Sequence, residues 1–191
     1  MVSRSLVLAY HGCDASLVRS IVSGTAELLP SINNYDWLGS GRYFWEDSYT
    51  RALLWAQKDT SRKIKEPAVL GAIVDLGNCL NLIDAEHLEL VVAAHKAYLS
   101  LCKASGSTPL QNKGKDFHAR FLDKVVCETL HKLRQEEGKP AFDTVRAFFV
   151  EGEPLYETSG LRSLDHIQIC VRSPQQILGY FLPLVGPLAK S

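Results

Sequence analysis

Apolar and polar positions near the start of the chain follow first a strand period and then a helix period. Residues 6–10 form a short apolar run with β character, and apolar side chains at helical spacing follow Asp14 as far as Gly24. Asp14 is a favourable N-cap, and glycine commonly ends a helix. This segment therefore predicts a strand, a turn at His11 and Gly12, and a helix.

The remainder of the chain repeats this alternation. Asp47 or Ser48 can begin a second helix that extends to about Lys58, and the β-branched stretch 68–76 predicts a strand. A period near 3.6 then predicts two helices within residues 84–138. The chain closes with three further segments of strand character, at residues 144–151, 166–172 and 178–182.

Helices and strands in this order predict an α+β fold. The 191 residues, of which 46% are hydrophobic, are enough to fill one core, so we expect a single domain over residues 1–191. The helical pair at 84–138 would then be an insertion between segments that build the sheets, and these segments come from both ends of the chain.

Charge and cysteine content exclude several classes of partner. The charges of the 21 basic and 21 acidic side chains cancel, so no overall electrostatic field attracts nucleic acid or an anionic membrane. A zero net charge is still compatible with a local basic patch. No apolar run approaches the roughly 18 residues of a membrane span. The 5 cysteines show neither a disulfide framework nor the spacing of a metal site. We expect reduced thiols in a cytoplasm, no metal and no membrane partner.

Two glycine-containing stretches could carry chemistry. The first is Tyr10-His11-Gly12-Cys13, and the second reads GSGRYFWE at residues 39–46, where three aromatic residues follow two glycines. Each stretch alone fits an ordinary turn or the packing of a core. Together, a histidine and a tyrosine at two glycine-punctuated strand ends suit a pocket for a flat ring that carries an amide group.

Three motifs resemble, in order along the chain, those of the ADP-ribosyltransferase superfamily, in its branch related to diphtheria toxin and the poly(ADP-ribose) polymerases. They read YHG, GSGRYFWEDSYTRALLWA and PAVLGAIVDLGNCLNLID. The branch has a His-Gly turn, a Gly-x-Gly-x-Tyr-Phe strand followed by a helix, and an apolar strand ending in Leu-Gly-Asn. The resemblance covers about residues 6–83, and more loosely 144–182. It implies split antiparallel β-sheets around an NAD cleft, with the helical pair as an insertion that has no counterpart.

The resemblance also implies roles for individual residues, with NAD as the substrate. His11 would bind the ribose of NAD, and Gly12 would hold the nicotinamide carboxamide through its backbone. Tyr43 would stack on the nicotinamide ring. Further residues expected at or beside the NAD site are Cys13, Tyr35, Gly41, Arg42, Phe44 and Ser48.

The catalytic glutamate that the family carries at the start of a late strand is missing from DHIQICV, residues 165–171. His166 and Gln168 alternate onto one face of that strand, and either could take its place, with Gln168 favoured. Glu151 and Glu46 are the competing carboxylates, although each could equally be a solvated charge at a strand end. A neutral glutamine supplies no full charge to the transition state, which argues against polymer formation.

The expected reaction is mono-ADP-ribosylation of a macromolecule with release of nicotinamide. RNA is slightly preferred over protein as the acceptor, because Tyr35 and Trp37 could stack an unpaired base. His166 could accept a proton from the attacking group. Basic side chains that could contact phosphates, or could simply be solvated, are Arg42, Arg62, Lys63, Lys65, Lys113 and Lys115.

Family analogy points to the toxin of a bacterial toxin-antitoxin or phage-defence system, so an antitoxin protein is a further expected partner. The rival hypothesis, from a different class, is an NAD- or ADP-ribose-binding pseudoenzyme that keeps the pocket without the glutamate. A third interpretation takes every aromatic residue as core packing and requires no ligand.

Overall fold

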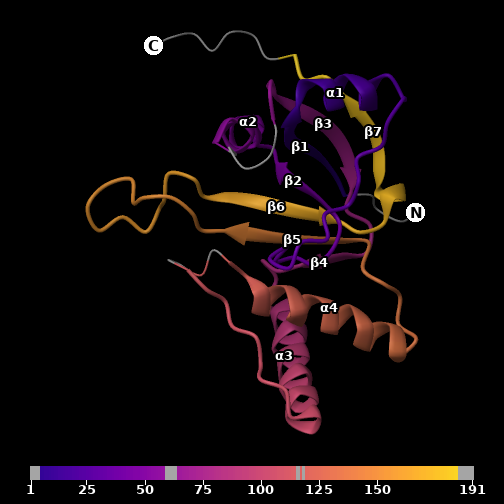
Figure 1. The fold of residues 1–191 in the computed structure, drawn as a ribbon, viewed down its shortest axis with the longest axis vertical. Helices are drawn as coiled ribbons and strands as arrows, with labels where there is room; N and C mark the ends of the chain where they lie inside the picture. The colour runs from indigo at the N-terminus through magenta and orange to yellow at the C-terminus, as the bar shows by residue number, and fades with distance from the viewer. Residues whose placement is uncertain (1–4, 59–63, 115–116, 118, 185–191) are drawn as a thin grey trace.

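The structure, a computed structural model, describes residues 5–58, 64–114, 117 and 119–184. Its strands and helices are shown in Figure 1. The strands are β1 (Leu6–Asp14), β2 (Arg42–Glu46), β3 (Pro67–Asp75), β4 (Cys79–Asn81), β5 (Thr144–Phe149), β6 (His166–Val171) and β7 (Ile177–Phe181). The helices are α1 (Ala15–Val22), α2 (Tyr49–Lys58), α3 (Ala85–Ser105) and α4 (Phe121–Glu136), with a short 3-10 helix η2 (Pro174–Gln176). The predicted mixture of helices and strands is confirmed.

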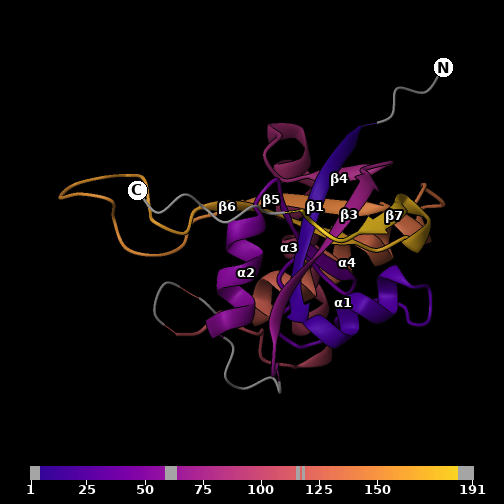
Figure 2. The ribbon, with the colours of Figure 1, turned by 90° about the horizontal axis from the view of Figure 1, so that it is seen from above.

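The strands form a seven-stranded sheet in the order β4-β5-β6-β2-β1-β3-β7, with a narrow seam near its centre. At this seam β1 and β2 pair only through Ala9 with Glu46 and Tyr10 with Trp45. Figure 2 shows β1 and β3 crossing β5 and β6, so the sheet consists of a β4-β5-β6-β2 half and a β1-β3-β7 half. Two separate antiparallel sheets were expected, whereas the halves are joined by hydrogen bonds and β4 runs parallel to β5.

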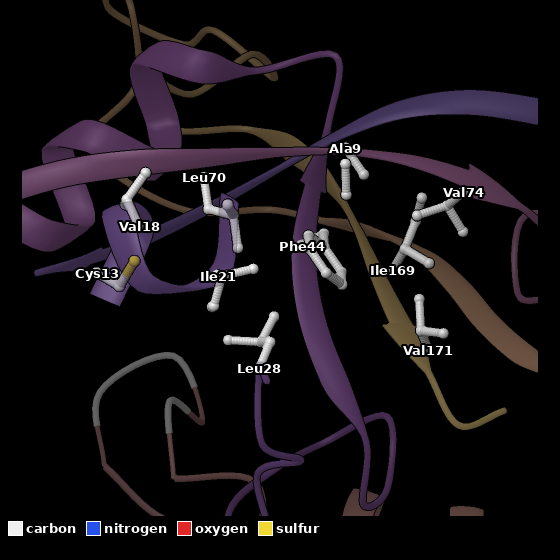
Figure 3. Close-up of a cluster of buried hydrophobic side chains, with 11 residues drawn as sticks. Ala9, Cys13, Val18, Ile21, Leu28, Phe44, Leu70, Val74, Ile169 and Val171 are labelled. Atoms are coloured by element: carbon white, nitrogen blue, oxygen red, sulfur yellow. The ribbon is translucent and has the colours of Figure 1, made fainter. Parts of the chain in front are cut away.

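One hydrophobic core is shared by the two halves of the sheet and α1 (Figure 3). Phe44 of β2 and Ile169 of β6 are fully buried in it, together with Leu70 and Val74 of β3 and Val18 of α1. Burying a side chain of this size stabilises the fold by about 1.5–3 kcal/mol. The core therefore holds together the two halves that the short seam joins.

Helices α3 and α4 form a second core with the β4-β5-β6 part of the sheet. Ala94 of α3 and Leu130 of α4 are buried in a cluster with Leu80 of β4 and Val145 of β5. The same cluster contains Leu38 from the loop before β2. The helical pair thus packs against the sheet and also against the segment that leads into the GSGRYFWE stretch.

Capping residues define several predicted helix ends. The Asp14 carboxylate accepts a hydrogen bond from the backbone N–H of Ser16 at 2.9 Å and caps α1 as predicted. Asp84 caps α3 in the same way, and Gly106 ends that helix with a left-handed φ of 67°. These local signals were readable because each depends on residues close together in the sequence.

The predicted turn at His11 and Gly12 is wrong. β1 continues through both residues to Asp14, and each is paired with a residue of β3. A Cβ on Gly12 would collide with the backbone oxygen of Ala52 in α2. The glycine therefore allows close packing of α2 on β1, which is a different role from opening a turn.

Two further boundaries differ from the sequence prediction. β4 was not expected, because three residues are too few to display strand alternation, and its partner β5 lies far along the chain. The second helix predicted within residues 84–138 begins at Phe121, and Phe117 lies outside it with a φ of 55°.

Candidate functional site

A cavity of about 270 Å³ lies where β1, β2, β6 and α2 meet the loop that precedes β2. It combines aromatic walls with two arginines and two carboxylates. Its lining residues are His11, Leu29, Ser31, Tyr35, Asp36, Trp37, Tyr43, Trp45, Arg51, Trp55, Arg120, Phe149, Glu151 and Gln168. Five residues proposed from the sequence for NAD binding or catalysis thus border one cavity, although they come from distant parts of the chain: His11, Tyr35, Tyr43, Glu151 and Gln168.

The His11 ring is oriented by the neighbouring half of the sheet. Its Nδ1 lies 2.8 Å from the backbone oxygen of Tyr43 in β2. A carbonyl oxygen can only accept, so Nδ1 donates, and Nε2 is then the acceptor of the neutral imidazole. This hydrogen bond also fixes the position of β1 relative to β2 beyond their short pairing.

The Tyr43 hydroxyl belongs to the loop and not to the cavity. It accepts a hydrogen bond from the Leu38 backbone N–H at 3.0 Å and donates one to the Gly39 oxygen at 2.8 Å. Burial raises the pKa of Tyr43 far above that of an ordinary tyrosine, so the phenol stays protonated. These two hydrogen bonds fix the side chain against the loop, and Tyr43 also belongs to the cavity lining.

Gln168 is held by an indole from the loop before β2. Trp37 Nε1 donates a hydrogen bond to Gln168 Oε1 at 2.8 Å. Since an indole N–H can only donate, the amide oxygen must face Trp37, and the Nε2 amide group is the remaining donor. The orientation of Gln168 is therefore fixed by chemistry.

Arg51 and Glu151 form an ion pair at the cavity. Arg51 Nη2 lies 2.7 Å from Glu151 Oε2, and Arg51 Nε donates to the Leu164 oxygen at 3.2 Å. The Arg51 side chain is only 11% exposed and that of Glu151 is 29% exposed. Glu151 is thus a cavity carboxylate whose charge is largely compensated by a partner, and not a solvated charge at a strand end.

Three side chains stack beside Gln168. The Trp37 and Phe149 rings meet edge to face with centroids 4.8 Å apart. The Arg120 guanidinium lies 4.9 Å from the Trp37 centroid and 4.4 Å from the Phe149 centroid. Such contacts are worth about 0.5–1 kcal/mol each at exposed sites and more when desolvated. Trp37 is thereby held in the cavity wall, and its predicted stacking on an unpaired base stays a prediction.

The loop before β2 is held in place by α4. Lys124 Nζ donates to the Asn33 oxygen at 2.8 Å, and Glu128 Oε1 accepts from the Ser40 backbone N–H at 2.6 Å. Within the loop, Asp36 Oδ2 accepts from the Asn33 backbone N–H at 2.6 Å. The predicted insertion thus positions one wall of the cavity.

His166 does not line the cavity. Its side chain is 1% exposed and stacks on Phe149 with centroids 5.2 Å apart. Nδ1 donates to the Leu164 oxygen at 2.7 Å, and burial lowers the pKa of His166 below that of an ordinary histidine. The side chain supports Phe149 from behind, so the predicted proton acceptor for an attacking group is wrongly placed.

Glu46 is not part of the cavity lining either. Both of its carboxylate oxygens accept from Arg146 of β5, at 2.6 and 2.8 Å. This bidentate pair ties β2 to β5 across the intervening strand β6. Of the two competing carboxylates, only Glu151 borders the cavity.

Six residues predicted at or beside the NAD site are not part of its lining, namely Gly12, Cys13, Gly41, Arg42, Phe44 and Ser48. Cys13 and Phe44 are core residues, and burial raises the pKa of the Cys13 thiol to about 11. A Cβ on Gly41 would press against Cys170, so this glycine allows β2 to approach β6. Arg42 Nε donates to the Leu28 oxygen at 2.6 Å.

None of the described residues that were predicted to contact phosphates borders the cavity. Arg62, Lys63 and Lys115 lie outside the described residues. Lys65 and Lys113 are described, but neither borders the cavity. In the described ranges no cluster of three or more His, Cys, Asp or Glu side chains could hold a metal ion, and no described helix is long and apolar enough to cross a membrane.

Sequence reasoning missed Arg51, Trp55, Arg120 and Phe149 as cavity residues. For Arg51 and Trp55 a signal existed. They lie at i and i+4 on one helix, so a polar and an aromatic side chain share a face. Nothing local marks Arg120 or Phe149, which reach the cavity through the packing of α4 and β5.

Comparison with known proteins gives one distant relative. The chain is 26% identical over 200 aligned residues to a protein of Methanocaldococcus jannaschii that is itself described as uncharacterized; the match spans 93% of this chain and 87% of the relative. No family model and no solved structure matches the chain.

Proposed function

We propose that the chain binds NAD in this cavity and transfers ADP-ribose to a macromolecule, with release of nicotinamide. The observation that carries the proposal is the meeting of His11, Tyr43 and Gln168 around one cavity, from three strands that pair in a single sheet. His11 and Tyr43 lie in motifs at which the sequence resembles ADP-ribosyltransferases, and Gln168 is the favoured replacement for the glutamate that the late strand lacks.

The size and chemistry of the cavity suit the nicotinamide end of NAD. The cavity of about 270 Å³ is slightly smaller than the roughly 300–1,000 Å³ of typical ligand pockets, so in this proposal it takes only the nicotinamide ring and its ribose. In this proposal the Tyr43 ring supplies a stacking surface, and His11 lies in the cavity lining beside the ribose.

The reaction would proceed through an oxocarbenium-like ribose. The bond between ribose C1′ and the nicotinamide nitrogen breaks, and its electron pair returns to the ring, which leaves as neutral nicotinamide. A nucleophile of the acceptor forms the new bond to C1′ and gives up a proton. Gln168 Nε2 can donate a hydrogen bond to a ribose oxygen, and this orients the sugar without adding charge.

A second candidate is an NAD- or ADP-ribose-binding module without catalysis. It is favoured by the state of the two cavity carboxylates, since Asp36 accepts from the Asn33 backbone and Glu151 is paired with Arg51. Neither is an isolated charge that could stabilise a developing cation.

Incubation of the purified protein with NAD separates the two candidates. We expect free nicotinamide, detected by chromatography, to accumulate with time and enzyme concentration. Calorimetric binding of NAD without nicotinamide release would support the binding module, and absence of both would refute the cavity assignment. The variant Glu157→Gln is a control for a change at an exposed site. Because Glu157 lies outside the cavity lining, this variant should behave like the parent.

The proposed acceptor is RNA in preference to protein, and the proposed setting is a toxin-antitoxin or phage-defence system with an antitoxin partner. Tyr35, which is 48% exposed and borders the cavity, remains suited to stack an unpaired base. Treating labelled whole-cell extract with ribonuclease or protease distinguishes the two acceptor classes.

A further inference from the structure

A second cavity, of about 360 Å³, lies between α3, α4 and β4, at the end of the sheet where Figure 1 shows the two helices. We call it the helical-pair cavity. None of the described residues that are proposed to contact NAD lies in its lining. The apolar part of this lining consists mainly of Leu80, Leu82, Val91, Val92, Leu122 and Val126.

The helical-pair cavity has a buried floor and an accessible side. Leu80 of β4 and Val126 of α4 are 0% and 5% exposed, whereas Val92 of α3 is 54% exposed. A molecule that enters beside Val92 therefore reaches apolar surface that the fold already shields from water. The hydrophobic effect favours the transfer of an apolar molecule to such a surface.

The charged side chains of the lining favour an uncharged ligand. Arg120 Nη1 lies 3.2 Å from Asp123 Oδ2, so these two opposite charges compensate each other within the wall. Asp123 Oδ1 also accepts a hydrogen bond from Asn112 Nδ2 at 2.8 Å. A charged ligand would lose its hydration in a largely apolar cavity and would meet a like charge beside the opposite one. His95 also borders the cavity, and an imidazole can exchange a hydrogen bond with a hydroxyl or carbonyl group.

The volume of the helical-pair cavity favours a small molecule over a protein segment. Ligand pockets typically have volumes of roughly 300–1,000 Å³, and a cavity of about 360 Å³ lies within this range. A protein interface of standard size buries about 800 Å² on each partner, which is more surface than one cavity of this volume presents.

Two residues, Trp37 and Arg120, line both the helical-pair cavity and the cavity of the candidate site. Trp37 Nε1 donates the hydrogen bond that orients Gln168, and the Arg120 guanidinium lies 4.9 Å from the Trp37 ring centroid. Trp37 also packs against the hydrophobic cluster that contains Leu80 and Val126. A molecule in the helical-pair cavity would therefore lie against the residue that holds Gln168.

We propose that the helical-pair cavity is a binding site for a small uncharged molecule with an aliphatic body and at most one hydroxyl or carbonyl group, and that its occupant restrains Trp37. The restraint reaches Gln168 through the hydrogen bond between the two side chains. An occupant thus acts on the candidate site without entering it. The binding site itself does not depend on the proposed function.

The test compares three probes with the same aliphatic chain, namely octanol, octanoate and octylamine. The protein is labelled with fluorotryptophan, and fluorine NMR follows the Trp37 resonance, which the variant Trp37→Phe assigns. We expect octanol to shift this resonance with saturation, and each charged probe to bind about tenfold or more weakly. A shift that grows linearly without saturation, or equal binding of the three probes, would overturn the proposal.

A matched pair of variants locates the site. Val92 and Leu101 both lie on α3 and are 54% and 58% exposed, but Leu101 is not part of the lining. Val92→Phe should weaken octanol binding about tenfold or more because the larger side chain occupies the cavity, whereas Leu101→Phe should bind like the parent.

Val126→Phe adds bulk at the floor of the cavity and should weaken octanol binding as well, with circular dichroism as the control for folding. Octanol binding that stays at the parent level in Val92→Phe and Val126→Phe would refute the site. Equal losses in Val92→Phe and Leu101→Phe would also refute it, because the effect would then not depend on the cavity.

Hydrogen exchange of the Trp37 indole N–H measures the restraint. Saturating octanol should slow this exchange about threefold or more in the parent and should have no effect in Val92→Phe. The Trp45 indole is the internal control, since Trp45 is not part of the lining. Saturable binding with unchanged Trp37 exchange would refute the restraint. All arms omit NAD, so a lack of nicotinamide release would refute the proposed function and leave this test unaffected.

Discussion

Gln168 shows how one hydrogen bond can decide the chemical character of a site residue. Trp37 Nε1 occupies the amide oxygen, so a glutamine here offers an N–H donor to the cavity. A glutamate at the same position could accept from Trp37 with one oxygen and turn the other oxygen, with its charge, toward the ligand.

This orientation gives a prediction for two variants of Gln168. Gln168→Glu should raise the rate of nicotinamide release at least tenfold, because a carboxylate stabilises the oxocarbenium-like state that a neutral amide does not. Gln168→Ala removes the preorganised contact, typically worth about 2.7–4 kcal/mol, and should slow release at least about a hundredfold. Single-turnover kinetics measure both, and circular dichroism controls for folding. Equal rates in all three proteins would show that Gln168 does not contact the reacting ribose.

Tyr43 carries two separable roles, one in its hydroxyl and one in its ring. Tyr43→Phe leaves the Leu38 N–H and the Gly39 oxygen without their partner, and should lower the free energy of unfolding by about 1–3 kcal/mol. NAD affinity should change little in that variant, whereas Tyr43→Ala should weaken NAD binding clearly. Denaturant unfolding and calorimetry measure the two effects. A Tyr43→Ala protein that binds NAD like the parent would remove Tyr43 from the binding site.

The sequence located the residues of the site that sit in recognisable motifs, His11 and Tyr43 among them. It favoured Gln168 over His166 but had no local signal for which of the two is buried, because both lie on one strand face and only packing against Phe149 buries the histidine. It also left Glu151 undecided, since its ion pair with Arg51 joins residues 100 positions apart. Contacts of this range have no local signature.

At the scale of elements, α4 is a support for the cavity and not an appendage. It contacts the loop before β2 through Lys124, Glu128 and the Cys127 thiol, whose Sγ lies 3.2 Å from the Leu38 oxygen. Burial raises the pKa of Cys127 to about 12, so this thiol remains protonated and donates to that oxygen.

Removing the hydrogen bond between Glu128 of α4 and the Ser40 backbone should make the loop before β2 more mobile without changing a residue of the cavity lining. Glu128→Ala leaves the Ser40 backbone N–H without its acceptor, at a cost of about 1–3 kcal/mol, and should raise KM for NAD several-fold. Glu128→Gln is the matched control, since its amide oxygen can still accept from Ser40. Hydrogen exchange of the loop should accelerate in the alanine variant and stay close to the parent in the glutamine variant. Unchanged exchange in Glu128→Ala would refute the anchoring role.

Element prediction succeeded where signals were local and failed where pairing was distant. The Asp14 cap was readable from neighbouring residues, and the helical signal was expected from residue 84, where Asp84 caps α3. β1 was predicted too short because glycine at position 12 suggests a turn, whereas tertiary packing of α2 requires it within a strand. β4 is specified only by its partner in β5.

At the scale of the whole molecule, His131 of α4 links stability to pH. Burial, together with the charges of Arg172 and Arg134, lowers the pKa of His131 to about 4. In the unfolded chain a histidine titrates near 6.5, so between about pH 6.5 and 4 the unfolded state binds a proton that the folded state does not. The contribution of neutral His131 to the free energy of unfolding is therefore fully present above about pH 6.5. That free energy should fall by up to about 3 kcal/mol as the pH drops toward 4.

The His131→Asn variant tests this linkage. Denaturant unfolding at pH 7 and pH 5 should show a smaller loss of stability on acidification than in the parent. Some pH dependence should remain, because burial also lowers the pKa of His166. An identical slope in parent and variant would show that His131 is not the responsible group.

The short seam between β1 and β2 has a mechanical consequence for any ligand of the cavity. His11 lies on β1 and Gln168 on β6, so a molecule that contacts both spans the short β1–β2 pairing. Such a ligand links the two halves of the sheet, because separating them would break its contacts as well as the few hydrogen bonds between β1 and β2. A bound ligand should therefore stabilise the whole sheet against unfolding and not just the loops beside the ligand. The force needed to unfold the protein should accordingly rise when the ligand is bound.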